Sequence, residues 1–440
     1  MKKILKASGF VLATSFILAN TAQALPSTKY TASCKLLAPK EGKYDNSKVP
    51  TITSQSAFKK LTAANQAYAD GNFAEATTIL KDIIATSGDS AAQARAHYIL
   101  GLVYQQQDKL AQASAELQKA LNTKMMGPQN EAGIKQALAY LAAGQGKDRE
   151  ALKWLQDYFT DVINPPASAY AALAQGYYKL DELQNSICPA YLALKEGSTA
   201  KKALYGMLFA AHYRLKDMNG SEVVAKEMIN LFPEDKNTYS NLFAVYGQQQ
   251  KEKDMLALAE LAYLNGIWLS ESNYKQLSAL YANNDIPLLA AERLEEGMTK
   301  GIVKPTENLW SNVATNYSVA KEREKSIAAY GKASQYSDSG KYLYKIGNIY
   351  YDQEKYEQAI SKYKEALDKG NLKDNEKGYS YLWMGISQFR LGQVSNAIAS
   401  LNRAKSFKDT ATNAGQFLNY VNDLERQRRA MQEVASTESE

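Results

Sequence analysis

The chain has 440 residues and a formal net charge of +6, from 52 Lys and Arg against 46 Asp and Glu. Three of the lysines, Lys2, Lys3 and Lys6, lie in a segment that we expect to be removed, which leaves only about +3. A balance this small argues against a nucleic-acid binder or a binder of acidic polymers, because such proteins concentrate Lys and Arg on one face.

The first 24 residues have the layout of a secretory signal peptide. The early lysines precede an apolar run from Gly9 to Ala19. A small-residue cleavage motif follows at Ala22-Gln23-Ala24. We therefore expect cleavage before Leu25 and export to the bacterial periplasm. No later stretch approaches 18 uninterrupted apolar residues, so we expect no integral membrane insertion.

Residues 25–54 read as an extended arm, because they contain Pro26, Pro39 and Pro50 and show no helical periodicity. The arm also contains Cys34, which lies ten residues beyond Ala24 and is therefore poorly placed for a lipoprotein. Cys34 and Cys188 are the two cysteines of the chain, and in an exported protein they could form a disulfide worth roughly 4 to 5 kcal/mol. Two free thiols are the alternative. A bond would require the arm to lie back along the first repeats.

Residues 55–408 contain ten copies of one pattern, clearest in Gly347-x-x-Tyr350-x-x-x-x-x-Tyr356-x-x-Ala359-x-x-x-Tyr363-x-x-Ala366. Small residues at repeat positions 8, 20 and 27 allow two antiparallel helices to approach closely, and large residues fill the remaining gaps. The copies are spaced 33 to 38 residues apart, and their position-8 residues are Ala64, Gly101, Ala139, Ala174, Phe209, Phe243, Ser278, Ala314, Gly347 and Gly385.

This pattern resembles the tetratricopeptide repeat, which has a period of 34 residues. The resemblance implies an all-α, right-handed superhelical solenoid of about ten helical hairpins that binds other proteins and carries no catalytic centre. Phe209 and Phe243 depart from the small-residue rule, so we expect the fifth and sixth repeats to be splayed or bent.

Residues 409–440 are predicted to form a capping helix followed by a polar tail. Ala414, Phe417, Val421 and Leu424 recur at spacings of three and four, which indicates one apolar helix face. The basic cluster Arg426, Arg428 and Arg429 is interpreted as solvated surface, with contact to a membrane surface or an acidic partner as the alternative.

The sequence offers no constellation for catalysis. The two histidines, His97 and His212, fall where the repeat packs an aromatic residue, so we interpret both as core or half-buried residues. There is no metal-ligand spacing, glycine-rich phosphate loop or nucleophile elbow. We expect no cofactor, no metal and no enzymatic activity.

The resemblance also indicates where a partner would bind. In this family, side chains at position 12 point into the concave groove, and aromatic residues there give large contacts of the kind that dominate binding energy. The candidates are Tyr178, Tyr213, Tyr351 and Phe389 at position 12, with Tyr98 and Tyr344 at position 5. Ordinary packing is the alternative role of these residues.

A second candidate resembles the clamp with which co-chaperone repeats hold a peptide's terminal carboxylate. Residues of the right types occur in the seventh to ninth repeats, namely Lys275, Asn312, Lys341 and Lys345. One expected asparagine is replaced by Ala279, and chance is the alternative, because lysines are common on helix surfaces.

Roughly residues 270 to 425 resemble exported proteobacterial repeat proteins encoded beside TonB, ExbB and ExbD, which power outer-membrane uptake. The resemblance is carried by the stretches Ala291-Glu292-Arg293-Leu294-Glu295-Glu296-Gly297, Tyr344-Lys345-Ile346-Gly347-Asn348-Ile349-Tyr350, Glu365-Ala366-Leu367-Asp368-Lys369-Gly370 and Leu382-Trp383-Met384-Gly385-Ile386. It implies a periplasmic scaffold that assists a TonB-type nutrient-uptake complex. The alternative is a chaperone-like factor for outer-membrane or envelope-polymer assembly.

Overall fold

The computed structural model describes residues 37, 42–45, 47 and 49–437, with side chains to residue 432. The predicted signal peptide and Cys34 lie outside the described residues. The chain divides into two compact units, the first ending at Pro233 and the second beginning at Glu234. Each unit is described by itself.

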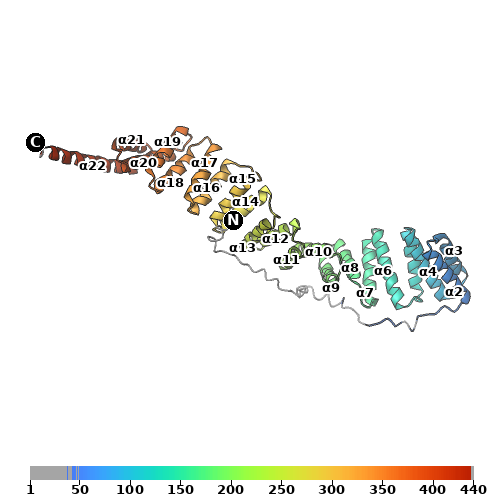
Figure 1. Ribbon diagram of the computed structural model, residues 1–440. Helices are drawn as coiled ribbons and strands as arrows, with labels where there is room; N and C mark the ends of the chain where they lie inside the picture. The colour runs from blue at the N-terminus through green and yellow to red at the C-terminus, as the bar shows by residue number, and fades with distance from the viewer. Residues whose placement is uncertain (1–36, 38–41, 46, 48, 438–440) are drawn as a thin grey trace, which may run out of the picture. The chain divides into compact units, whose positions relative to one another are not determined.

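The described part of the first unit consists of five consecutive helical hairpins (Figure 1). Within it, the second helix of each hairpin packs against the first helix of the next. The helices are α2 (Gln55–Ala69), α3 (Phe73–Thr86), α4 (Ser90–Gln106), α5 (Leu110–Asn122), α6 (Pro128–Gly144), α7 (Asp148–Asp161), α8 (Ala167–Lys179), α9 (Leu183–Lys195), α10 (Lys201–Arg214) and α11 (Met218–Leu231).

The second unit repeats this arrangement with five more hairpins and one long helix in its described part. The helices are α12 (Lys236–Gln248), α13 (Glu252–Leu264), α14 (Glu271–Asn283), α15 (Pro287–Thr299), α16 (Glu307–Val319), α17 (Arg323–Gln335), α18 (Lys341–Asp352), α19 (Tyr356–Lys369), α20 (Asp374–Arg390), α21 (Val394–Lys405) and α22 (Ala411–Thr437). The predicted all-α fold of ten hairpins is confirmed. The last helix, α22, packs against α21 through the buried Ala414, Leu418 and Val421.

Every hairpin turns at one residue with a left-handed backbone, and this residue always stands at repeat position 15. The φ angles lie between 56° and 75°, although most of the ten are not glycine: Gly71, Asp108, Gly146, Asp181, Lys216, Gln250, Asp285, Lys321, Glu354 and Gly392. The next amide, at position 16, donates to the carbonyl of position 11 at 2.7–2.9 Å in all ten turns. This is the Schellman arrangement, which satisfies a helix-end carbonyl and stops the first helix at a fixed residue.

Position 8 sets how closely the two helices of a hairpin approach. A methyl group added at Gly101 would lie 2.8 Å from the Leu117 side chain, and one added at Gly385 would lie 2.9 Å from Leu401. Where position 8 is Phe209 or Phe243, the helices of the hairpin contact each other less than in any other described hairpin. This agrees with the splaying expected of the fifth and sixth repeats.

The described residues of the arm lie along the first unit and run against the order of its hairpins, from α8 back toward α4. The backbone carbonyl of Leu37 accepts from the Tyr170 hydroxyl at 3.3 Å, and the Tyr44 hydroxyl accepts from the Ile163 amide at 3.0 Å. Nearer the first helix, the Pro50 carbonyl accepts from Arg95 at 2.9 Å. The arm therefore lies along the edge where one hairpin joins the next.

The end of the arm is fixed by Asp89, the residue before α4. One carboxylate oxygen accepts from the amides of Thr53 at 2.6 Å and Ser54 at 2.9 Å, and the other caps α4 through the Ala92 amide at 3.0 Å. The bonds from the Ser54 and Ala92 amides hold the pKa of Asp89 far below its ordinary value of 3.8.

Cys188 lies fully buried in α9 and is disulfide-bonded. The other cysteine of the sequence, Cys34, lies outside the described residues, so the pairing of the two stays a prediction. None of the helices in the described part of the chain has the length and apolar character needed to cross a membrane.

The hairpin turns predict that alanine substitutions at two glycines change the stability of the fold in opposite directions. Gly392→Ala should destabilise the tenth hairpin by about 1 to 2 kcal/mol, because its φ of +74° disfavours a side chain although the space beside it is open. Gly331→Ala in α17 should stabilise by about 0.5 to 1 kcal/mol, because the added methyl meets nothing and the backbone is helical. Hydrogen exchange of the corresponding peptides measures both changes. Shifts of the same sign would contradict the role assigned to position 15.

The anchoring of the arm leads to a pH prediction. Asp89 has a lowered pKa in the folded chain, so its stabilising effect is fully present above its unfolded pKa of 3.8 and is lost progressively as the pH falls from that value through the much lower folded pKa. Asp89→Asn removes the charge that accepts the Thr53 and Ser54 amides, so it should weaken the start of α4 by about 1 kcal/mol at pH 7, and this difference should shrink steadily as the pH falls below 4. Hydrogen exchange across residues 49–95 tests this. Asp70→Asn is the control, because the exposed Asp70 accepts a side-chain bond only from Gln66, at 2.9 Å. Equal, pH-independent losses in both variants would refute the anchor.

Candidate functional site

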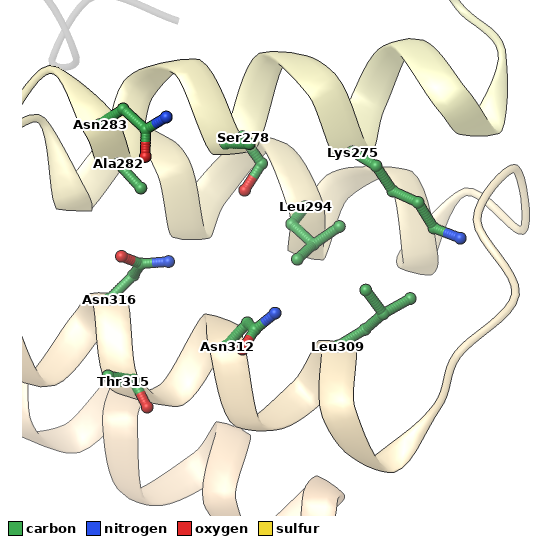
Figure 2. Close-up of a pocket in the computed structure, with 10 residues that line it drawn as sticks. Lys275, Ser278, Ala282, Asn283, Leu294, Leu309, Asn312, Thr315 and Asn316 are labelled. Carbon is green, nitrogen blue, oxygen red and sulfur yellow. The ribbon is translucent and has the colours of Figure 1, made fainter.

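A pocket of about 410 Å³ lies between α14 and α16, the first helices of two successive hairpins in the second unit (Figure 2). The side chains of Asn312 and Asn316 extend from α16 toward α14, and Asn283 of α14 lies opposite Asn316. Leu294 of α15 closes the base. The lining residues are Lys275, Ser278, Ala279, Ala282, Asn283, Leu294, Leu309, Asn312, Thr315 and Asn316. We call this the amide pocket.

The polar groups of the amide pocket fall into two classes. The Ser278 hydroxyl donates to the Ala290 carbonyl at 2.7 Å, and the Thr315 hydroxyl donates to the Ser311 carbonyl at 2.8 Å. Both hydroxyls are therefore engaged within the protein. The side-chain amides of Asn283, Asn312 and Asn316, by contrast, make no hydrogen bond with another described residue.

The four residues of the predicted clamp do not line one pocket. Lys275 and Asn312 both line the amide pocket, with Ala279 between them. The Lys275 ammonium, however, is 2.6 Å from the Glu271 carboxylate one turn earlier on α14.

The other two clamp residues lie on α18. Lys341 is 2.6 Å from Glu307 of α16, and the Tyr342 hydroxyl donates to the same carboxylate oxygen at 2.9 Å. These two hydrogen bonds lower the pKa of Glu307. The Lys345 ammonium stands 5.2 Å from the centre of the Tyr330 ring. Two of the three clamp lysines are thus already paired with carboxylates.

The six predicted groove aromatics are all half-buried, and each packs against neighbours. In the first unit, Tyr98 and Tyr178 pack against two separate apolar clusters, and Tyr213 stacks on Phe209 with ring centres 5.8 Å apart. Burial raises the pKa of Tyr98. All three therefore help to pack the fold while part of each side chain stays exposed.

In the second unit the remaining three groove aromatics also contact other rings. The ring centre of Tyr344 is 6.2 Å from that of Tyr363, Tyr351 is 4.9 Å from Trp383, and Phe389 is 5.6 Å from Phe417. Trp383 in turn stacks on Tyr379 at 6.4 Å.

Tyr351, Trp383 and Tyr379 form an aromatic series across α18 and α20. Sequence reasoning missed Trp383 and Tyr379, which stand at positions 6 and 2 of the tenth repeat. Asn312 and Lys341 occupy the same two positions in other repeats. An aromatic residue at position 6 or 2 was therefore the signal that could have identified Trp383 and Tyr379 as candidates.

The stretch Ala291–Gly297, which carries part of the TonB-type resemblance, is engaged in packing between repeats. The Tyr263 hydroxyl of α13 donates to Glu296 at 2.8 Å, and the Tyr317 hydroxyl of α16 donates to Glu295 at 2.6 Å. Arg293 stands 4.8 Å from the Tyr263 ring centre. The charged side chains of this stretch thus join α15 to α13 and to α16.

Each of the two histidines lies beside a carboxylate. His212 is buried and its ring lies 2.9 Å from Asp217, and His97 is half-buried with its ring 2.6 Å from Glu116. The interpretation of both as core or half-buried residues is confirmed. Within the described ranges, no cluster of three or more His, Cys, Asp and Glu side chains could hold a metal ion.

Comparison with known proteins identifies the repeat. Residues 61–130 and residues 340–370 match models of the tetratricopeptide repeat. Repeats of this kind generally mediate protein–protein interaction and are typically non-catalytic. No curated protein matches the chain.

Several solved structures are similar in fold. A tetratricopeptide repeat protein from Parabacteroides merdae is 17% identical, with a TM-score of 0.34, over 64% of this chain and 94% of that one. The C-terminal part of a repeat protein from Cytophaga hutchinsonii is 14% identical, with a TM-score of 0.34, over 63% and 95%. The TPR2AB domain of yeast Sti1, solved with pHSP90, is 15% identical, with a TM-score of 0.33, over 63% and 98%. At these values we draw nothing about partners from them.

The aromatic series gives a stability prediction. Trp383→Ala should destabilise the second unit by about 2 kcal/mol, less than a fully buried tryptophan, because the ring is half-buried between Tyr351 and Tyr379. Hydrogen exchange of α18 and α20 measures the change. Tyr336→Ala is the control and should stay within about 0.5 kcal/mol, because that side chain is 51% exposed. A neutral Trp383→Ala would show that the series does not stabilise the fold and would favour a role in binding alone.

Proposed function

We propose that this protein is a non-catalytic scaffold that holds an extended segment of a partner protein along the first helices of its second unit. The observation that carries the proposal is the amide pocket, whose asparagine amides have hydrogen-bonding capacity that the described chain leaves unused. The aromatic series on α18 and α20 extends the same set of first helices. Unused polar groups beside aromatic rings are the features expected of a surface that binds polypeptide.

The proposal places the scaffold in the bacterial periplasm. Its support is the sequence of Lys2 to Ala24, in which a positively charged N-terminal region, a short apolar core and an Ala-x-Ala cleavage motif occur together. The disulfide at Cys188 agrees with an oxidising compartment. N-terminal sequencing of protein from a periplasmic extract would then begin at Leu25.

We further propose that the partner belongs to a TonB, ExbB and ExbD complex that powers nutrient uptake. The support is the resemblance of roughly residues 270 to 425, together with a long repeat surface that an extended partner segment could follow. Part of that resemblance is carried by residues that pack between repeats, such as Glu295 and Glu296. Trp383, which is half-buried like them, contacts the Tyr351 ring and belongs to the aromatic series.

Apart from Lys275, which pairs with Glu271, the lining of the amide pocket is uncharged, and this favours the second candidate function, a chaperone-like factor for outer-membrane or envelope-polymer assembly. A pocket that does not select a charged side chain would accept many unfolded segments, and a chaperone-like factor requires this breadth of binding.

In-cell crosslinking separates the two candidates. A photo-crosslinking residue replaces Ala282, which lines the amide pocket, and in a matched strain it replaces Lys364, which is exposed on α19, a second helix of the same unit. We expect TonB, ExbB or ExbD to be recovered from the Ala282 strain and not from the Lys364 strain. Recovery of outer-membrane proteins or envelope-assembly factors instead would favour the chaperone-like function. Absence of any product specific to Ala282 would refute the scaffold proposal for this face.

Growth supplies the second readout. A deletion strain should grow poorly on a scarce iron chelate that enters through a TonB-dependent receptor and normally on freely diffusing iron. Equal growth on both sources, without crosslinks to the TonB complex, would remove the uptake role.

A further inference from the structure

We propose that the arm straps the first unit together and that the disulfide of Cys188 is its latch, so that the redox state of one bond decides whether the third and fourth hairpins are held to each other. The proposal goes beyond the scaffold function and does not rest on it. Every contact that carries it lies within the first unit, whereas the amide pocket belongs to the second.

The first step is the spread of the contacts that the described arm makes. They fall at three successive junctions between hairpins, one before each of α4, α6 and α8. From the first junction to the third, these contacts are Thr53 and Ser54 with Asp89, Val49 with Gly127, and Tyr44 with Ile163. In a bare solenoid each repeat contacts only its neighbours. Here one extended segment, continuous with α2, reaches from the first hairpin to the fourth.

The second step is the seat of Leu37, the described arm residue farthest along the chain from α2. Leu37 is half-buried and packs against two apolar clusters. One cluster includes Leu152 and Leu155 of α7, and the other includes Cys188 of α9. The Leu37 carbonyl accepts from the Tyr170 hydroxyl of α8 at 3.3 Å. This residue therefore joins the third hairpin to the fourth.

The third step is the latch itself. Cys188 is disulfide-bonded and fully buried in a cluster against which Leu37 packs. The other cysteine of the sequence, Cys34, lies outside the described residues and precedes Leu37 by three positions. Three residues of extended chain span at most about 11 Å, so the seat of Leu37 is compatible with a bond between the two cysteines. Such a bond fixes one end of the arm, and the chain running into α2 fixes the other.

Opening the latch is a two-electron reduction. Two glutathione thiols supply the two electrons and two protons, the S–S bond breaks, and the products are two cysteine thiols and one glutathione disulfide. The Leu37 end of the arm is then free to peel from α7, α8 and α9. The Thr53 and Ser54 end stays in place, because it is bonded to Asp89 and joined directly to α2.

The first test compares hydrogen exchange of the purified chain with the bond intact, of the same chain in reducing buffer, and of the variant Cys34→Ser. Exchange across residues 160–173 should rise about tenfold or more in both unlatched forms, because the Ile163 amide loses the Tyr44 hydroxyl that accepts from it. Residues 271–335, in the second unit, are the internal control and should stay within about twofold. Cys34→Ser leaves the buried Cys188 unchanged, so the variant keeps its core.

The second test measures the equilibrium between bond and thiols in a glutathione buffer. In the reduced chain the two thiols meet only while the Leu37 end is docked, so weaker docking lowers the oxidation equilibrium constant. Leu37→Ala should lower it about tenfold, and Tyr44→Phe, which removes the hydroxyl bonded to the Ile163 amide, about threefold. Phe58→Ala is the control and should stay within about twofold, because that side chain on α2 is 59% exposed.

Three results would overturn the latch. Unchanged exchange across residues 160–173 after reduction would show that the arm stays docked without the bond. Equal increases in both units would show that reduction destabilises the chain generally. Peptide mapping without reductant that finds Cys188 of one chain bonded to a cysteine of a second chain would assign the disulfide to a dimer. None of these results bears on the amide pocket, so the scaffold function is tested separately.

Discussion

The left-handed residue at position 15 is the constraint from which the rest of the architecture follows. It allows the amide of position 16 to reach the carbonyl of position 11, and this bond recurs in all ten turns at 2.7–2.9 Å. Lys216, Gln250 and Glu354 occupy the position as well as glycine, although a non-glycine residue there costs roughly 1 to 2 kcal/mol. The turn is therefore maintained by the hydrogen bond and by the packing of the two helices. Because the first helix always ends at the same repeat position, the second helix always starts in the same register.

A fixed register determines which side chains meet. In the three repeats with glycine at position 8, this residue faces position 24, as Gly101 faces Leu117 and Gly385 faces Leu401, so the small residue and the large one fill a single gap. The same register brings positions 9, 12 and 13 of α14 opposite positions 6, 9 and 10 of α16. The amide pocket results from this alignment, since Asn283 and Asn316 lie on different helices and meet only if both hairpins keep the register.

The sequence was sufficient for the fold because its signal is steric and periodic. The position-8 residues recur every 33 to 38 residues and are small in eight of the ten copies, and the resemblance of this pattern to the tetratricopeptide repeat predicted about ten hairpins. The turn residues could not be predicted in the same way, because Lys, Gln and Glu carry no signal for a left-handed backbone. The site was less predictable still. Pairing of Lys341 with Glu307 involves side chains from two repeats, and Tyr178 packs against a cluster whose members come from α8, α9 and α10. In the sequence Trp383 belongs only to a family-like stretch, because its contact with Tyr351 joins α20 to α18 of a different repeat.

These contacts indicate where function should be sought in a stacked repeat. Glu295, Glu296 and Arg293 look like a conspicuous charged motif, yet each is held by a tyrosine of an adjacent helix and so contributes to stacking. Charges of this kind will recur in any solenoid with similar neighbours, whatever it binds. Asn283, Asn312 and Asn316 show the opposite behaviour, because they contribute no hydrogen bond to the described fold and lie beside an apolar base. Polar groups that the fold does not use are the ones available to a partner. The partner's chemistry is therefore better inferred from these unremarkable amides than from the more distinctive charged stretch.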